Sequence, residues 1–259
     1  MKKIALCMSL LLALMLSGPI GAAEKPLDKQ PEKQVDNRLS EKEKGEGWLL
    51  LFNGKDYTGW KCNNGKEVRS KVEFDAMQPL HSGGHLIVYE KPFGDFILQF
   101  DVKVDTKKNK KGHPANSGLF FRIEDLKDPV NTGLELQVLG GGSKGIHGFG
   151  SIYDIAPSTK NPTKGDGKWD HVELMCVGPR IVTKINGQVV CQLNCDDLDQ
   201  PGERIGEGSH KFKLNKKPRA VKDFARRGYL GFQDHGDKAW YKNVKLLPLD
   251  LGNTTKKTK

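Results

Sequence analysis

The chain has 259 residues, with 42 Lys and Arg against 32 Asp and Glu, a net charge of +10 and 30 glycines. This length can bury a substantial core, and one large all-β domain fits it as well as two small domains. The lysines are spread over loops and tails, without a recognition helix or an aromatic-studded basic sheet, which excludes nucleic acid as the partner. The positive charge instead suits contact with an acidic polysaccharide or a cell surface, or serves only to keep the protein in solution.

Residues 1–23 have the composition of a secretory signal peptide. Lys2 and Lys3 precede an apolar stretch, and Gly21, Ala22 and Ala23 supply small residues for cleavage. The apolar stretch is too short to span a bilayer, so a membrane anchor is the weaker interpretation. We therefore expect an exported protein, periplasmic or extracellular, that is not inserted in the membrane after processing.

Two further segments are predicted to lie outside the folded domain. Residues 24–46 are rich in Glu, Lys, Gln, Asp and Pro and contain almost no large apolar side chains, which predicts a flexible leader. Residues 251–259 are predicted to form a basic tail. The segment between them, 47–250, is predicted to be a single domain.

Short alternating runs dominate this domain and predict strands. In 96–104, apolar side chains alternate with polar ones except at Ile97, and Asn186-Gly187 between two apolar runs predicts a two-residue hairpin. The charged segment 196–227 is the expected place for the only helix or helical turn. Neither strand–helix alternation nor a repeat is present, so we predict an all-β sandwich of two curved antiparallel sheets. The predicted strands are 48–52, 57–60, 85–89, 96–104, 116–123, 134–138, 169–177, 180–185, 188–193, 229–233 and 239–247.

The cysteines and acids do not predict a metal or cofactor. The four cysteines after residue 23 lack CxxC or Cys/His zinc spacing, and one disulfide or four buried thiols remain open alternatives. No HExxH, GxSxG, P-loop or EF-hand pattern is present. The acidic run 196–199 is interpreted as a solvated loop rather than a calcium site. Trp60, Trp169 and Trp240 are interpreted as core residues.

Two adjacent strand-like runs, 116–123 and 134–138, carry the most informative polar residues. By alternation, Asn116 and Arg122 share one side of the first run, and Glu135 and Gln137 share one side of the second. If the runs pair, all four residues line one polar surface of a rigid sheet. Glu135 then either forms an ion pair with Arg122 or serves as a site carboxylate that binds sugar hydroxyls or acts as a base.

Two other short stretches carry candidate site residues. Gln233 and His235 stand where a strand gives way to a turn; turn chemistry alone could explain this stretch, but histidine is also a natural acid or base near neutral pH. Tyr153 and Asp154 either form a structural corner or supply a stacking ring and a hydroxyl-binding carboxylate. His147, in a glycine-rich loop, is interpreted as a surface residue.

Several stretches together resemble one family. They are GWLLLFNGKDYTGW at 47–60, NSGLFFR at 116–122, LELQVL at 134–139, SIYD at 151–154, KWDHVEL…INGQVV within 168–190, and GYLGFQDHGDKAWYKNVKLLPL at 228–249. In this order they resemble the 3-keto-disaccharide hydrolase domain family over about residues 46–250. The resemblance implies a concanavalin A-like jelly roll and, for some members, hydrolysis of glycosides already oxidised at the sugar 3-position.

Two functions follow as hypotheses. The first is an exported 3-keto-glycoside hydrolase, in which Glu135 and His235 share the base and acid roles. Its sugar would be held by Asn116, Arg122, Gln137, Tyr153, Asp154 and Gln233. The second is a lectin-like module that uses the same residues to bind a sugar without turnover.

Overall fold

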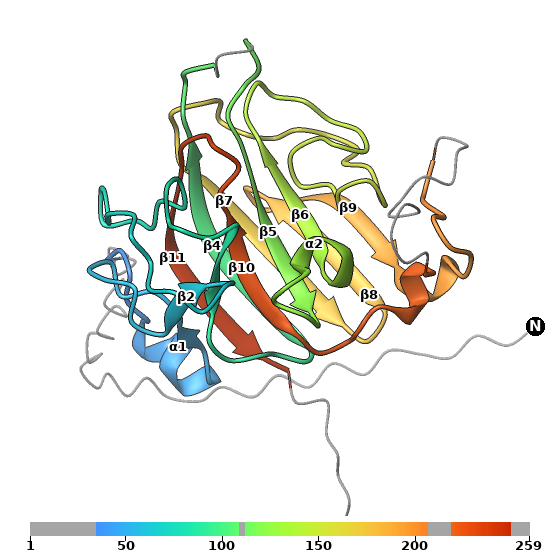
Figure 1. The fold of residues 1–259 in the computed structure, drawn as a ribbon, viewed down its shortest axis with the longest axis horizontal. Coiled ribbons are helices and arrows are strands. Elements are labelled where there is room, and N and C mark those ends of the chain that lie inside the picture. Colours follow the sequence, from blue (N-terminus) through green and yellow to red (C-terminus); the bar gives the residue numbers. More distant parts are fainter. Residues whose placement is uncertain (1–34, 109–111, 207–218, 250–259) are drawn as a thin grey trace, which may run out of the picture. The chain divides into compact units, whose positions relative to one another are not determined.

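The computed structural model describes residues 35–108, 112–206 and 219–249, and these residues form two antiparallel sheets (Figure 1). The predicted signal peptide, the leader up to residue 34 and the basic tail lie outside this part of the chain. Sheet A has the order β1 (Leu49–Leu50), β11 (Ala239–Pro248), β4 (Phe96–Val104), β7 (Asp170–Val177), β8 (Arg180–Ile185) and β9 (Gln188–Asn194). Sheet B has the order β2 (Trp60–Cys62), β3 (Leu86–Tyr89), β10 (Tyr229–Gln233), β5 (Asn116–Ile123) and β6 (Leu134–Leu139).

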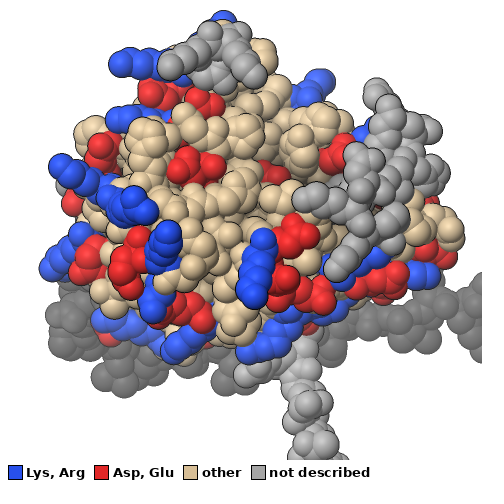
Figure 2. Space-filling view, in the orientation of Figure 1, with Lys and Arg blue, Asp and Glu red and all other residues tan. Residues whose placement is uncertain are grey.

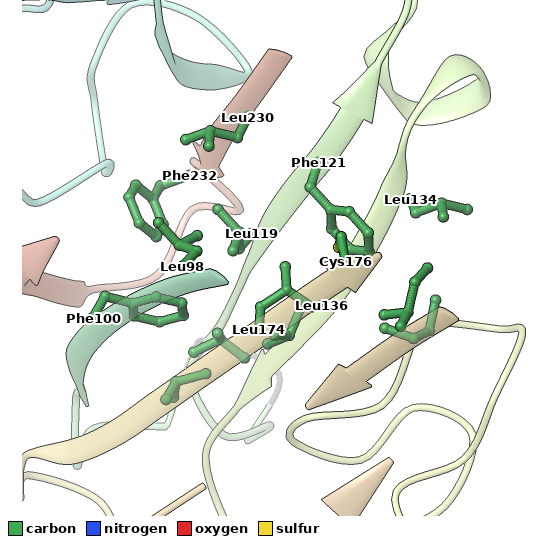
Figure 3. Close-up of a cluster of buried hydrophobic side chains, with 14 of the residues drawn as sticks. Leu98, Phe100, Leu119, Phe121, Leu134, Leu136, Leu174, Cys176, Leu230 and Phe232 are labelled. Carbon is green, nitrogen blue, oxygen red and sulfur yellow. The ribbon is translucent and has the colours of Figure 1, made fainter. Parts of the chain in front are cut away.

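The predicted all-β sandwich is confirmed, and the alternation that predicted it has a direct physical counterpart. Along β4, every second residue from Phe96 to Val104 is buried, because one side of the strand packs against the other sheet. Figure 3 shows side chains from both sheets meeting in this layer, among them Phe100, Leu119 and Phe232. The core therefore lies between the sheets and leaves the outer face of each sheet available for other roles.

Helix in the described residues is confined to short elements. They are α1 (Glu41–Glu46), α2 (Pro129–Thr132) and the 3-10 turns η1 (Cys195–Asp197) and η2 (Val221–Asp223). The prediction that 196–227 holds the only helix is therefore wrong, since both α-helices lie elsewhere. α1 begins at a capping box in which Ser40 and Glu43 bond each other's backbone N–H groups, a short-range signal in the sequence.

The flexible-leader prediction is also wrong for residues 35–46, which pack against β11. Asn37 is buried, and its side-chain Nδ2 donates to the carbonyl of Asp75. Glu43 of α1 forms an ion pair with the buried Lys245 of β11. The ordering of this segment rests on specific polar contacts rather than on apolar burial, which is why its composition did not predict it.

The four cysteines of the described residues are buried free thiols, which decides between the two alternatives that the sequence left open. Burial raises the pKa of Cys176 to about 12 and that of Cys191 to about 11. Thiols with such pKa values hold their protons at neutral pH and are poor nucleophiles.

A candidate active site on the outer face of sheet B

The register of sheet B brings the predicted polar residues together. In the β5–β6 pair, Gly118 lies opposite Gln137 and Phe120 lies opposite Glu135. Directly opposed residues of an antiparallel pair point to the same face. On the other side of β5, Phe232 pairs with Leu119, so the next residue, Gln233, adjoins Gly118. Glu135, Gln137 and Gln233 therefore share the outer face of sheet B.

Two glycines allow close packing on this face. A Cβ atom on Gly118 would overlap Oε1 of Glu135, so the carboxylate lies directly over the backbone of β5. A Cβ on Gly231 would meet the carbonyl oxygen of Ile87 at 2.8 Å. Glycine inside a strand often marks a close approach of this kind. The missing side chain at Gly118 thus makes room for the glutamate.

Buried amide groups surround the carboxylate. Gln137 is 3% exposed and Gln233 is 6% exposed. Among the described residues, no hydrogen-bond donor reaches Oε1 of Gln233 or the buried Oδ1 of Asn116. The backbone N–H of Asn116 donates to Asp237 Oδ2 in the β10–β11 turn, at 3.1 Å. Buried polar atoms are normally satisfied, so these two unpaired oxygens mark the polar centre of the face as unusual.

The segment 150–153 adds a wall along β6. The N–H of Gln137 donates to the carbonyl of Ser151 at 3.0 Å, and the N–H of Tyr153 donates to the carbonyl of Glu135 at 2.8 Å. Burial, followed by the negative charges of Glu135 and Asp154, raises the pKa of Tyr153. The phenol of Tyr153 therefore lies within the electrostatic reach of Glu135 and stays protonated near neutral pH.

A small network supports this wall from behind. The ring of His147 stacks on that of Tyr153, with 4.6 Å between the centroids. Asp154 Oδ1 contacts His147 Nε2 at 3.2 Å and accepts from an Arg204 guanidinium nitrogen at 2.7 Å. Asp154 thus positions neighbouring side chains, and His147 and Arg204 belong to the wall although the sequence did not assign them to the site.

Two histidines stand at the edge of the face. His235 is exposed in the β10–β11 turn, two residues beyond Gln233. His85, just before β3, accepts the N–H of Asp234 on its carbonyl, and its ring forms a T-shaped contact with that of Phe120. Burial and the positive charge of His235 lower the pKa of His85, against the opposing charge of Asp234. A neutral His85 can accept a proton at neutral pH, and sequence reasoning missed this residue.

Arg122 does not belong to this face, which overturns its predicted role in binding sugar. A bulge shifts the register between β5 and β10, and Arg122 has a φ of 53°. The extra residue reverses the alternation of the strand. The buried guanidinium instead contacts Asp95 Oδ1 at 3.3 Å and donates to the carbonyl of Gly178, between β7 and β8, at 2.7 Å. Arg122 therefore links sheet B to sheet A.

The remaining predicted residues fall into a consistent arrangement. Asn116, Glu135, Gln137 and Gln233 form the floor, which we call the sheet B face, with Tyr153 on its wall. His235 lies at the rim, and Asp154 contacts His147, which stacks on Tyr153. In the orientation of Figure 1, Figure 2 shows mostly uncharged residues and a small acidic patch at the centre, with many Lys and Arg toward the rim. In the described part of the chain, no group of three His, Cys, Asp or Glu side chains is placed to hold a metal ion.

This fold and face define a concanavalin A-like jelly roll with a polar, glycine-floored site on one sheet. Residues 47–247 match the family of the 3-keto-alpha-glucoside-1,2-lyase-like domain, and the chain belongs to that family.

Individual relatives agree with the family match. The chain is 25% identical to a 3-keto-disaccharide hydrolase of Bacteroides thetaiotaomicron over 79% of each chain. A solved structure of a candidate glycosyl hydrolase from Parabacteroides distasonis is 28% identical, with a TM-score of 0.63 over 83% of this chain and 100% of that one. A second structure from that organism is 23% identical, with a TM-score of 0.60 over 78% and 99% of the two chains, and supports the fold.

Proposed function

We propose that this protein is an exported enzyme that cleaves 3-keto-disaccharides or related 3-keto-glycosides by general acid–base chemistry. The proposal draws on the family, on the similarity to a 3-keto-disaccharide hydrolase and on the arrangement of the sheet B face. The observation that carries it is the carboxylate of Glu135, which lies over Gly118 beside the buried amides of Gln137 and Gln233.

The chemistry of a 3-keto sugar needs few catalytic groups. The ketone acidifies the C2–H bond, so a carboxylate can remove that proton and leave an enolate. The enolate then expels the C1 substituent as an alkoxide, which becomes an alcohol by taking up a proton from a general acid, and water later adds across the C1–C2 double bond to complete hydrolysis. A positioned base contributes about 10²–10⁴-fold to such a step.

Each proposed role rests on a group of the sheet B face or its rim. Glu135 is the proposed base, because its carboxylate is held over the backbone of Gly118 on a rigid sheet. The amide N–H groups of Gln137 and Gln233 are proposed to bind the keto sugar and the enolate oxygen. His235 at the rim is the proposed proton donor to the leaving group.

A direct glycosidase mechanism fits less well. Most glycosidases use two carboxyl groups that flank the scissile bond. The acid nearest the wall, Asp154, is already engaged by Arg204 and His147. An elimination started by one base at C2 needs no second carboxylate, which favours a keto sugar as the substrate.

The decisive experiment incubates the purified protein with a 3-keto-disaccharide and with the same disaccharide unoxidised. We expect monosaccharide release from the keto sugar alone, and a loss of about 10²–10⁴-fold in Glu135→Gln. Glu173→Gln is the matched control, because Glu173 is a strand glutamate of sheet A held by Lys184 at 2.7 Å, and it should keep full activity. Saturable binding of the sugar without release would establish the lectin-like alternative.

The proposal includes export, on the strength of residues 1–23. N-terminal sequencing of the protein recovered from the periplasm or medium should give a start near Ala23 or Glu24. Recovery of the protein in the cytoplasm with Met1 retained would contradict export.

A further inference from the structure

A lysine surrounded by aromatic rings occupies the outer face of sheet A. Of the two neighbouring tryptophans that were expected to be core residues, Trp240 is buried and Trp169 is half-buried. The ammonium of Lys103 lies 4.1 Å from the ring centroid of Phe74, 4.7 Å from that of Trp240 and 5.1 Å from that of Trp169. Lys238 and Lys242 nearby are each within ion-pair distance of a carboxylate. Lys103 has no such partner among the described residues, so its charge is open to an external anion.

The side chain of Phe74 is exposed, and its backbone is held in an unfavourable conformation. It is 66% exposed, the most exposed large hydrophobic side chain described, and sits with Asp75 in a two-residue turn with φ values of 57° and 55°. Such a turn favours Asn, Asp or Gly at both positions, and a bulky residue there is unusual. The turn is fixed from below, because Glu73 accepts the indole N–H of Trp240 at 2.9 Å. An exposed ring held rigidly in this way is suited to contact a ligand.

A hollow of about 380 Å³ continues this surface toward the β10–β11 turn. Trp240 and Lys238 form part of its lining, together with the exposed Lys107 and Lys108. Its two acids are already engaged: Asp105 accepts the N–H of Lys107, and Asp237 accepts that of Asn116. The hollow lies in the size range of ligand sites. Its three lysines outnumber its two acids, and it adjoins the turn that carries His235.

We propose that this Lys103 surface, made of Phe74, Lys103, Trp240 and the adjoining hollow, binds a stretch of anionic polysaccharide. A sugar ring would stack on Phe74, and its carboxylate or sulfate would pair with Lys103 and with the lysines of the hollow. Burial and the nearby charge of Lys242 lower the pKa of Lys103, and a bound anion would relieve that unfavourable environment. The surface lies on the opposite sheet from Glu135, so it acts as an anchor and its binding does not depend on turnover.

The test is a tryptophan-fluorescence titration of the chain lacking residues 1–23 with polygalacturonate, dextran sulfate and neutral dextran. We expect binding of a polyanion and none of neutral dextran, with the tighter polyanion identifying carboxylate or sulfate as the preferred group. Phe74→Ala and Lys103→Met should each raise Kd about tenfold, the loss of one cation or stacking contact. Glu135→Gln should bind like the wild type, which separates this result from that of the proposed catalysis.

The controls address the general attraction of a basic protein for polyanions. Lys184→Met removes one charge from the same face of sheet A, but from a lysine paired with Glu173. Val130→Ala truncates another exposed apolar side chain. Both should leave Kd within about twofold of the wild type. Equal weakening in Lys184→Met and Lys103→Met, absence of polyanion binding, or tighter binding of RNA through the same residues would overturn the proposal.

Discussion

The side chains of Asn37 and Asn243 each accept a hydrogen bond from the backbone of the other residue. Oδ1 of Asn243 accepts the N–H of Asn37 at 2.6 Å, and Oδ1 of Asn37 accepts the N–H of Asn243 at 2.9 Å. Both residues have positive φ values, 53° and 55°, which asparagine tolerates better than most residues. Asn243 lies where β11 shifts register against β4. The pair therefore attaches residues 35–46 to an irregular point of sheet A.

Asn37→Ala is expected to destabilise the protein by about 3 kcal/mol. Leaving the buried N–H of Asn243 unpaired costs about 2 kcal/mol, and alanine in the left-handed region costs about 1 kcal/mol more. Asn37→Gly removes the same hydrogen bonds, but glycine adopts the left-handed conformation without strain. This variant should therefore lose only the free energy that comes from the unpaired N–H of Asn243. Urea unfolding of the three proteins measures both, and equal midpoints would show that the segment contributes nothing to stability.

Gly118→Ala is expected to impair activity, whereas Gly231→Ala is expected to lower stability. The added methyl at Gly118 meets the end of the Glu135 side chain, which can swing aside, so the fold should persist while kcat/KM on a 3-keto-disaccharide falls by about 10²-fold. At Gly231 the methyl meets the backbone of Ile87, which cannot yield as easily, so the melting temperature should fall by several degrees. Thermal melts with activity per folded molecule separate these effects; a fully active Gly118→Ala would contradict the proposed position of the base.

Arg122→Met is expected to behave as a stability variant. Removing one partner of a buried ion pair costs about 3 kcal/mol, because Asp95 is left without its guanidinium. Activity per folded molecule should not change, since Arg122 faces away from the sheet B face. Arg122→Lys keeps the charge and provides a folded comparison. A raised KM with unchanged stability in either variant would show instead that Arg122 binds the sugar.

The lowered pKa of His85 predicts an acid-sensitive contribution to stability. An unfolded histidine titrates near 6.5, and the folded group titrates below it, so the unfolded chain binds the extra proton first as the pH falls. Wild type should therefore lose stability relative to His85→Gln between about pH 7 and pH 5, and show no such trend above pH 7.5. Urea midpoints of both proteins at several pH values measure this; a constant difference across the range would exclude the effect.

Alternation predicted most of this architecture because the strands of a sandwich bury every second residue. It located β4, β5 and β8 to the residue and placed Glu135, Gln137 and Asn116 on one face. It failed at Arg122, since a bulge changes the side-chain parity without any mark in the alternation of that strand. The sequence carried a usable sign of this close packing in Gly118 and Gly231, which occupy strand interiors. The approach of His85 to His235 arises from the pairing of β3 with β10, a long-range register that no local pattern contains.

The hydrogen bonds that attach residues 150–153 to β6 also cover an edge of sheet B. β6 is the last strand of sheet B in the described chain, and an exposed edge of this length would offer free N–H and C=O groups to another chain. The bonds from Gln137, Gly150 and Tyr153 occupy that edge. At the opposite edge, β2 has only three residues. The wall of the candidate site therefore also blocks edge-to-edge association, so loosening it by mutation should promote aggregation as well as impair the site.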